Sequence, residues 1–410
     1  MRSKERQARR DAYRDYCRER IPEDISNAQN VFTPYELCYD IIRKLDSKTR
    51  NLAKKRFLVL NLEFAEVLIH DFGVDCGNIE FWTDCDEKRK FCQLMYKGVL
   101  HKKIELNKEG IIEMTKEAKE MKNIDKFDVV IGNPPYQAPT KKLNIKNGSK
   151  GGRNTIWQHF IPLSFSLCKK NGFICLVHPA RWRKPEDKTG EILKTKNIRY
   201  LEMHSKYDGK KTFGAITNYD WYVLQNNNLV GQSTIRDYNG NFSRIDIWKL
   251  PLIPHFNFKI IDKLLAEEKE ETCPILYSRS AYGNDKSWMS REKSPEFKYP
   301  CVASTTKNKV KFLYSKVNTN GFFGISKVIF GDNGGDTGIY NSIVDIDGKF
   351  GITDHGLAIK IKSKSEGEKI KTALESEKFK ELIHSCQYGG FQIEWRMFKY
   401  FRKDFWKEFI

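Results

Sequence analysis

The sequence contains no apolar run long enough to cross a membrane, and its charged amino terminus lacks the hydrophobic segment of a secretory signal. The ten cysteines form no Cys-x-x-Cys pair and no cysteine and histidine cluster with the spacing of a zinc site. These absences argue against a membrane span, a disulfide framework and a structural zinc. We expect a cytoplasmic protein with reduced thiols and no metal.

Acidic residues are also relatively few: the chain has 53 of them against 72 lysines and arginines, which gives a net charge of +19. Aromatic residues make up 13% of the chain. A basic surface interleaved with aromatic rings favours a nucleic-acid partner. A proteome that is lysine-rich throughout would give the same balance, so charge alone does not decide. With 410 residues the chain is long enough for two domains.

Strand-like and helical segments alternate through the first half of the chain. The alternation predicts a parallel sheet with helices on both faces. Ligands bind beyond the carboxyl ends of such strands, and Asn61, Asp84 and Asn133 would project from that rim. The expected strands are Phe57–Leu62, Ile79–Trp82, Val99–Leu106, Phe127–Ile131, Gly172–Pro179 and Tyr219–Leu224; the expected helices are Phe64–Phe72, Lys88–Tyr96, Glu109–Met121 and Asn154–Cys168.

The stretch Phe-Asp-Val-Val-Ile-Gly-Asn-Pro-Pro-Tyr-Gln, residues 127–137, is the most informative in the chain. Its apolar run predicts a buried strand that Gly132 and two prolines end abruptly. Prolines have no N–H, so the carbonyls around Asn133 and Pro134 stay free to accept hydrogen bonds. With the Asn133 side-chain oxygen and the ring of Tyr136, this tip suits a planar group that carries an exocyclic amine.

This motif resembles the catalytic motif of S-adenosylmethionine-dependent DNA adenine-N6 methyltransferases of the restriction–modification class. The resemblance implies a Rossmann-like, doubly wound α/β methyltransferase sheet and an adenine flipped out of the duplex. It assigns catalysis to Asn133, Pro134, Pro135 and Tyr136: the Asn133 oxygen and the Pro134 carbonyl would accept from the amine, and Tyr136 would stack on the base. Phe213 resembles the late aromatic residue that contacts the flipped adenine in the family.

The segment Val-Phe-Thr-Pro-Tyr-Glu-Leu carries a second resemblance. Thr33 is a good helix N-cap and Pro34 a good first helical residue, so we expect a helix to begin here. In the family, a Thr-Pro step before the first strand lies against the methionine end of the cofactor. Thr33 and Pro34 are therefore assigned to S-adenosylmethionine binding.

The turn after the first strand departs from the family pattern. The family has a glycine-rich turn there, which lets the backbone approach the cofactor, whereas residues 60–66 contain no glycine. By the resemblance, Asn61 or Glu63 would take the place of the acidic residue that binds the cofactor's amino group. Asp84, or alternatively Asp86, would bind the ribose hydroxyls after the second strand.

We expect four regions along the chain: a basic arm or helix (1–28), the catalytic domain (29–228), a linker (229–254) and a smaller α+β domain that recognises the DNA target (255–410). The last would contain one long helix over Glu366–Ser385. Double-stranded DNA is the expected partner, and cleavage would need a separate restriction endonuclease because the short amino-terminal arm leaves no room for a fused one. The competing hypotheses are an inactive, methyltransferase-like DNA-binding subunit and a methyltransferase acting on RNA adenine or a glutamine amide.

Overall fold

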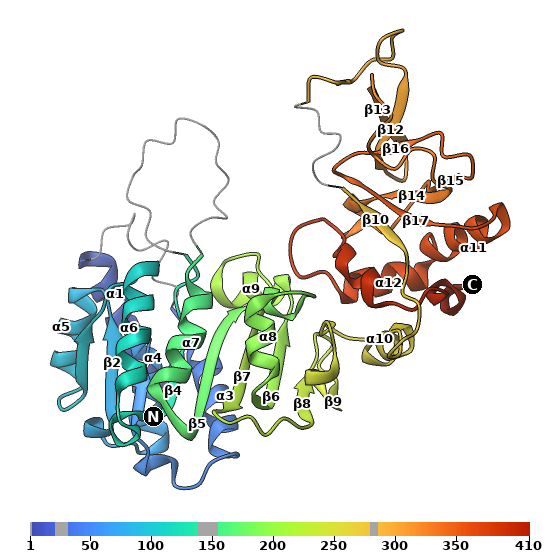
Figure 1. Ribbon diagram of the computed structural model, residues 1–410. Coiled ribbons are helices and arrows are strands. Elements are labelled where there is room, and N and C mark those ends of the chain that lie inside the picture. The colour runs from blue at the N-terminus through green and yellow to red at the C-terminus, as the bar shows by residue number, and fades with distance from the viewer. Residues whose placement is uncertain (1, 21–31, 138–154, 279–285) are drawn as a thin grey trace. The chain divides into compact units, whose positions relative to one another are not determined.

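The computed structural model describes residues 2–20, 32–137, 155–278 and 286–410 (Figure 1). The chain forms two compact units: one comprises Met1–Trp182 with Lys188–Lys249, and the other Arg183–Asp187 with Leu250–Ile410. The first unit is a doubly wound α/β domain of the Rossmann-like type, as predicted, and the second is a smaller α+β unit.

A nine-stranded sheet with the order β3-β2-β1-β4-β5-β7-β6-β8-β9 forms the centre of the first unit. Neighbours from β3 to β5 are parallel, and β7 runs antiparallel to both β5 and β6. The strands are β1 (Phe57–Val59), β2 (Ile79–Thr83), β3 (Leu100–Lys103), β4 (Phe127–Gly132), β5 (Cys168–Pro179), β6 (Asn197–His204), β7 (Tyr219–Gln225), β8 (Ser233–Arg236) and β9 (Phe242–Ile245).

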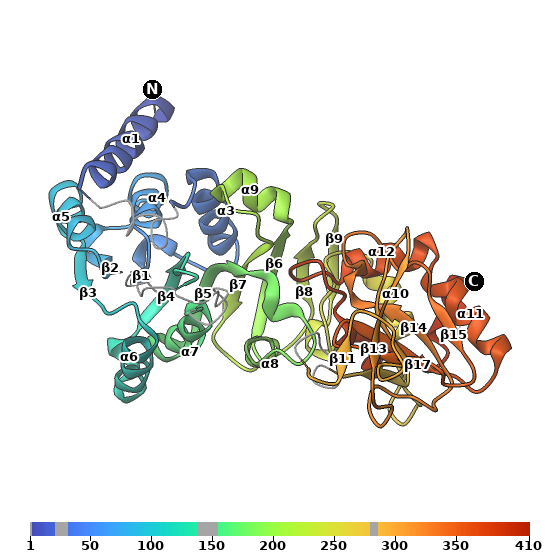
Figure 2. The same ribbon diagram turned by 90° about the horizontal axis from the view of Figure 1, so that it is seen from above.

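Helices cover both faces of this sheet (Figure 2). One face carries α3, α4, α5 and α9, and the other carries α6, α7 and α8. Strands covered on both sides become continuous apolar runs, which is why β1 is buried at every position. The helices are α1 (Arg2–Arg20), α3 (Tyr35–Asp46), α4 (Leu62–Phe72), α5 (Asp86–Met95), α6 (Lys108–Glu120), α7 (Trp157–Leu167), α8 (Lys188–Lys194) and α9 (Lys206–Phe213).

Residues 229–254, predicted as a linker, contain β8 and β9, which extend the sheet of the first unit. Residues 237–241 form the turn of this hairpin. There the Asp237 carboxylate accepts hydrogen bonds from the backbone N–H groups of Asn239 (2.9 Å) and Asn241 (2.8 Å). Hairpin turns and flexible linkers are both rich in Asn, Asp and Gly, so composition alone does not distinguish them. Of the predicted arm 1–28, residues 2–20 form α1, and 21–28 lie outside the described residues.

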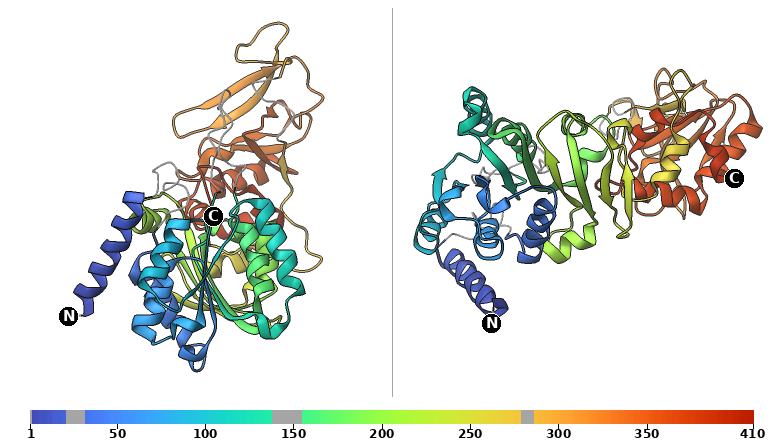
Figure 3. Two further views of the ribbon diagram at one scale, coloured as in Figure 1. Left: turned by 90° about the vertical axis from the view of Figure 1, so that its left-hand side faces the viewer. Right: turned by 90° about the horizontal axis from the view of Figure 1, so that it is seen from below.

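The second unit contains two four-stranded sheets, ordered β10-β17-β14-β15 and β11-β13-β12-β16 (Figure 3). Helices α11 and α12 and the carboxyl-terminal aromatic residues form its main core with β14 and β17. The elements are α10 (Phe258–Leu264), β10 (Ile275–Tyr277), β11 (Met289–Ser290), β12 (Tyr299–Thr305), β13 (Val310–Ser315), β14 (Lys327–Gly331), β15 (Ile343–Asp345), β16 (Gly351–Ile352), β17 (Gly356–Lys360), α11 (Lys364–Leu374) and α12 (Glu377–Ser385).

The single helix predicted over Glu366–Ser385 is wrong, because the structure has two helices there. The chain leaves helical hydrogen bonding after Leu374, and Ser376 accepts a hydrogen bond from the backbone N–H of Phe379 (3.1 Å) as the N-cap of α12. A serine at this position competes with the helix for backbone donors and so starts a new helix. In one continuous helix, Phe379, Leu382 and Ile383 would face away from Ile370, Ala373 and Leu374. The break lets both apolar sets pack into the same core.

Candidate functional site

The carboxyl ends of β1 and β4 lie side by side, with Val59 paired in parallel register with Ile131. The sheet order reverses at this pair, since β2 and β3 continue on one side of it and β5 on the other. In doubly wound sheets such a reversal opens a crevice that receives ligands. The segments that follow the two strands, from Asn61 and from Asn133, are thereby placed at the ligand-binding edge.

Asn133 is held by two hydrogen bonds. Its backbone N–H donates to Oδ1 of Asn61 (2.6 Å), and its Nδ2 donates to Oγ1 of Thr33 (3.4 Å). The residue is only 6% exposed, and its Oδ1 has no hydrogen-bond partner among the described residues. Leaving such an atom without a partner costs about 1–3 kcal/mol, so an unsatisfied acceptor at a fixed position indicates a site that a donor on a ligand would complete.

Gly132 allows the two strand ends to approach this closely. A Cβ atom at this position would lie 2.6 Å from Cβ of Leu60 and 3.0 Å from Oδ1 of Asn61. The turn after β1 lacks glycine, but the neighbouring strand supplies one at the point where the two chains come together. Close backbone approach at this edge therefore depends on β4.

Tyr136 is half-buried, and its carbonyl accepts a hydrogen bond from the backbone N–H of Ile156 (3.1 Å). Its hydroxyl is buried and has no hydrogen-bond partner among the described residues. Burial raises the pKa of this hydroxyl, and the nearby Tyr219 and Asp220 act in the same direction. The hydroxyl therefore stays protonated and can donate, while the stacking role assigned to the ring remains a prediction.

Thr33 is not the helix cap that the sequence predicted. Pro34, at φ −57° and ψ 146°, occupies the N-cap position and α3 begins at Tyr35. This frees the threonine for other contacts: its backbone N–H donates to Oε1 of Glu63 (3.0 Å) and its hydroxyl accepts from Asn133. Thr33 thus joins the residues predicted for the cofactor to those predicted for the base. The sequence gave no signal for this bridge, because its partners lie 30 and 100 positions away.

Glu63 lies in the first turn of α4. Burial raises the pKa of its carboxyl, and the charge of Lys88 opposes that shift. Of the two residues proposed for the cofactor's amino group, Asn61 uses its side-chain oxygen to accept from Asn133, whereas Glu63 offers a carboxylate with a second oxygen. The carboxylate is the better ligand for a cation.

Asp84 and Asp86 differ in their surroundings. Asp86 is exposed as the first residue of α5 and pairs with Lys103 and with Arg89 (3.0 Å). Asp84 is half-buried and follows β2 directly at the same edge of the sheet as Asn61 and Asn133. The assignment of one of these carboxylates to the ribose hydroxyls stays a prediction.

Phe213 is the last residue of α9 and is half-buried. Its ring makes an edge contact with Tyr219, with the ring centres 4.9 Å apart, and packs against the core of the first unit. The structure thus places Phe213 in a packing contact, and its assignment to the flipped base stays a prediction.

A small cavity of about 70 Å³ lies beside Thr33, Pro34 and Glu63. Pockets that enclose a whole drug-sized ligand have volumes of about 300 to 1,000 Å³, so this cavity would admit only one end of a cofactor. Its polar lining fits a charged amino-acid group, and three of the predicted cofactor residues contribute to it. The residues present therefore fit the methionine end of the predicted cofactor.

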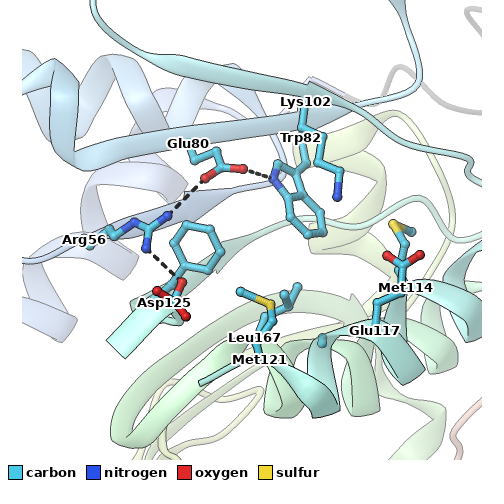
Figure 4. Close-up of a pocket in the computed structure, with 11 residues that line it drawn as sticks. Arg56, Glu80, Trp82, Lys102, Met114, Glu117, Met121, Asp125 and Leu167 are labelled. Carbon is cyan, nitrogen blue, oxygen red and sulfur yellow. Dashed lines mark hydrogen bonds and ion pairs between the residues drawn. The ribbon is translucent and has the colours of Figure 1, made fainter. Parts of the chain in front are cut away.

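A larger cavity of about 310 Å³ opens between β2 and α6 (Figure 4). It lies near the amino ends of β1 and β4, and none of the predicted site residues lines it. Arg56 pairs there with Glu80 (3.4 Å), which also accepts from the indole of Trp82 (2.7 Å). Arg56 and Glu80 satisfy one another there, and the smaller cavity is the one that predicted site residues line, namely Thr33, Pro34 and Glu63.

Two absences among the described residues concern metal ions and membranes. No group of three or more His, Cys, Asp or Glu side chains in this part of the chain is arranged to hold a metal ion. None of the helices in the described ranges combines the length and apolar character needed to span a bilayer.

Comparison with known proteins confirms the resemblance drawn from the Asn133–Tyr136 motif. Residues 44–213 match the Eco57I restriction-modification methylase family. An "uncharacterized adenine-specific methylase" of Mycoplasma pneumoniae is 32% identical over 127 residues, which cover 29% of this chain and 27% of that protein. The chain therefore matches only about a quarter of this relative's length.

Solved structures show more distant similarity. A modification subunit of a putative type I restriction enzyme from Vibrio vulnificus aligns with 55% of this chain and 50% of its own, at 13% identity and a TM-score of 0.40. The DrdV–DNA complex aligns with 95% of this chain and 57% of its own, at 10% identity and a TM-score of 0.48.

Proposed function

We propose that this chain is a DNA methyltransferase that transfers a methyl group from S-adenosylmethionine to the N6 amine of a flipped adenine in a restriction–modification system. The observation that carries the proposal is the buried Oδ1 of Asn133, which has no partner among the described residues and is fixed by Asn61 and Thr33. An exocyclic amine supplies the donor that this oxygen lacks. The family match over residues 44–213 supports the same assignment.

The chain's own residues would act mainly by alignment. Asn133 Oδ1 and the Pro134 carbonyl accept from the two amine hydrogens, which draws the nitrogen lone pair out of conjugation with the ring. Pro135 keeps this tip out of any regular structure, and Tyr136 provides the surface for the base. S-adenosylmethionine, when bound, supplies an electrophilic methyl group. Holding donor and acceptor in line accounts for a large share of the rate in such a displacement.

The cofactor would lie along the carboxyl edge of β1 and β2. Glu63 takes its ammonium group, Asp84 its ribose hydroxyls, and Thr33 and Pro34 line its methionine end. Thr33 donates a hydrogen bond to Glu63 and accepts one from Asn133. These two bonds fix the residues that would bind the cofactor relative to those that would bind the base. A one-step transfer requires such a fixed distance between the two ligands.

Double-stranded DNA is the proposed substrate, and the second unit is the proposed target-recognition domain. The net charge of +19 suits a polyanion, and flipping is needed because the N6 amine of adenine is buried in the duplex. A separate restriction endonuclease would complete the system.

The test is transfer of labelled methyl groups from S-adenosylmethionine to unmodified genomic DNA, followed by digestion to nucleosides. We expect the label in N6-methyldeoxyadenosine. Label in cytosine, or transfer to RNA or to a protein amide but not to duplex DNA, would overturn the adenine assignment.

The glycine-free turn at residues 60–66 favours one alternative, a DNA-binding subunit that has lost cofactor binding. Calorimetric titration separates the two, because the alternative predicts DNA binding with no heat of cofactor binding in the presence or absence of duplex. Saturable binding of S-adenosylmethionine would rule that alternative out.

A further inference from the structure

The small cavity at the carboxyl edge has a wall that lies outside the sheet and its covering helices. Residues of α1 close it on one side, and the segment before α3 and the first turn of α4 close it on the others. Figure 2 shows α1 beside α5, on the side of that helix that faces away from the sheet. The lining residues are Tyr13, Arg14, Phe32, Thr33, Pro34, Tyr35, Glu36, Glu63 and Glu66.

Aromatic contacts dock α1 at this position. The ring of Tyr13, only 7% exposed, makes an edge contact with Phe32 (centres 5.3 Å apart) and lies 4.9 Å from the ring of Phe91. One turn further on, Tyr16 contacts the same Phe91 ring (5.1 Å) and donates a hydrogen bond to Glu87 (3.1 Å). The helix is thus packed against α5 through one face, and it brings its neighbouring side chains to the cavity.

Charges of both signs meet at this cavity. The carboxyl groups of Glu63 and Glu66 line it from α4 and that of Glu36 from α3, and Arg9 of α1 pairs with Glu66 (3.3 Å). Arg14 is exposed and lies over the Phe32 ring, 5.8 Å from its centre. A cavity lined by a buried carboxyl and an exposed guanidinium complements a zwitterionic amino-acid group, with its ammonium inside and its carboxylate outside.

We propose that α1 completes the cofactor pocket and that Arg14 binds the α-carboxylate of the methionine end. Glu63 binds the ammonium, and Tyr13 with Phe32 forms the wall beside it. This inference rests on the proposed function and deepens it. It also bears on the glycine-free turn, because α1 adds contacts to the amino-acid end beside the one that Glu63 makes.

Calorimetric titration with two ligands tests the assignment on the full chain. S-adenosylhomocysteine carries the amino-acid group, whereas 5′-methylthioadenosine keeps the nucleoside and the thioether but lacks that group. Arg14→Ala is expected to weaken S-adenosylhomocysteine binding about 10- to 100-fold and to leave 5′-methylthioadenosine binding unchanged. Arg14→Lys should recover part of the loss.

Lys4→Ala is the matched control, since it removes the same charge from the same helix. Lys4 is exposed and is not part of the cavity lining. This variant should bind both ligands as the wild type does. Circular dichroism of the three variants should show an unchanged helix content, because Arg14 and Lys4 are exposed.

Equal weakening of both ligands by Arg14→Ala, or affinity for S-adenosylhomocysteine within twofold of wild type, would overturn the inference and leave the proposed function standing. The expected ligand pattern without methyl transfer to adenine would support the α1 pocket and refute the proposed function. A wild-type chain that binds neither ligand would refute both.

Discussion

The tip of β4 and the turn after β1 lie side by side at the same edge of the sheet, but they use their polar atoms differently. At the tip, Oδ1 of Asn133 and the hydroxyl of Tyr136 are buried without partners among the described residues. In the turn, Oδ1 of Asn61 and Oε1 of Glu63 both accept from backbone N–H groups. The tip is prepared for a ligand, while the turn holds the tip in place.

This difference changes the meaning of the missing glycine. The glycine-free turn suggested a defect in cofactor binding, but its Asn61 accepts a hydrogen bond from the backbone N–H of Asn133, and Gly132 of β4 provides the space for that contact. The two regions therefore act as one unit. Substitutions in each should show which of them serves the base and which the cofactor.

The largest effect is expected for Asn133→Ala. Removing a fixed polar group that acts on the reacting atoms costs about 10²- to 10³-fold in rate, so single-turnover methyl transfer should fall by that factor. S-adenosylmethionine affinity, measured by calorimetry, should change little, because the turn after β1 remains. Asn228→Ala, in a surface loop, is the control. Retention of near wild-type transfer by Asn133→Ala would contradict the mechanism.

Gly132→Ala should affect the tip and the turn together. The added Cβ would overlap Leu60 and press on Asn61, and overpacking of this kind costs about 1–3 kcal/mol in free energy of unfolding. Urea denaturation should show this loss, and methyl transfer should fall with it. Gly231→Ala, with open space around the new Cβ, is the matched control. Equal stability of the two variants would show that the strand ends do not need the close approach.

Thr33→Val should reduce transfer about tenfold, a loss typical of one hydrogen bond to a positioned group. The variant keeps the shape and the backbone donor to Glu63 but removes the acceptor for Nδ2 of Asn133. Thr33→Ser keeps that acceptor and should retain most activity. If serine and valine lower the rate equally, the hydroxyl is not what orients the asparagine.

A smaller effect is expected from pH. Because burial raises the pKa of Glu63 above its usual value, its carboxyl takes up a proton at a higher pH than an exposed glutamate would. Lys88 opposes the shift and Glu66 adds to it, Glu36 and Arg14 also line the cavity, and Arg9 pairs with Glu66. Binding of the cofactor's ammonium needs the charged form, so affinity should fall on acidification, and the fall should begin at a higher pH than for an exposed glutamate. Glu63→Gln should remove this step from calorimetric titrations at a series of pH values, and a persisting step would assign it to another group.

Helices and strands were predictable from the sequence wherever the local hydrophobic pattern agrees with the burial seen in the structure. The strand over Phe127–Ile131 and the alternation of strands and helices from Phe57 to Leu224 are confirmed, since apolar runs between turn residues admit few other structures. Predictions that rested on turn composition or on one long amphipathic segment were less accurate. The linker at 229–254 contains a hairpin of the sheet, and the helix over Glu366–Ser385 is interrupted at Ser376, because turn residues and capping serines do not show from sequence which structure they end.

The sequence by itself determined the class of fold and the motif at Asn133–Tyr136, because both depend on residue order within one strand and its end. Only the tertiary structure decided how Thr33, Asn61, Glu63 and Asn133 are joined. Those hydrogen bonds cross from one segment to another over up to 100 positions, and parallel pairing of β1 with β4 brings the segments together. The position of α1 was also decided by the tertiary structure. Its contacts with Phe32 and Phe91 place Arg14 at the cavity, and the sequence of α1 does not reveal that position.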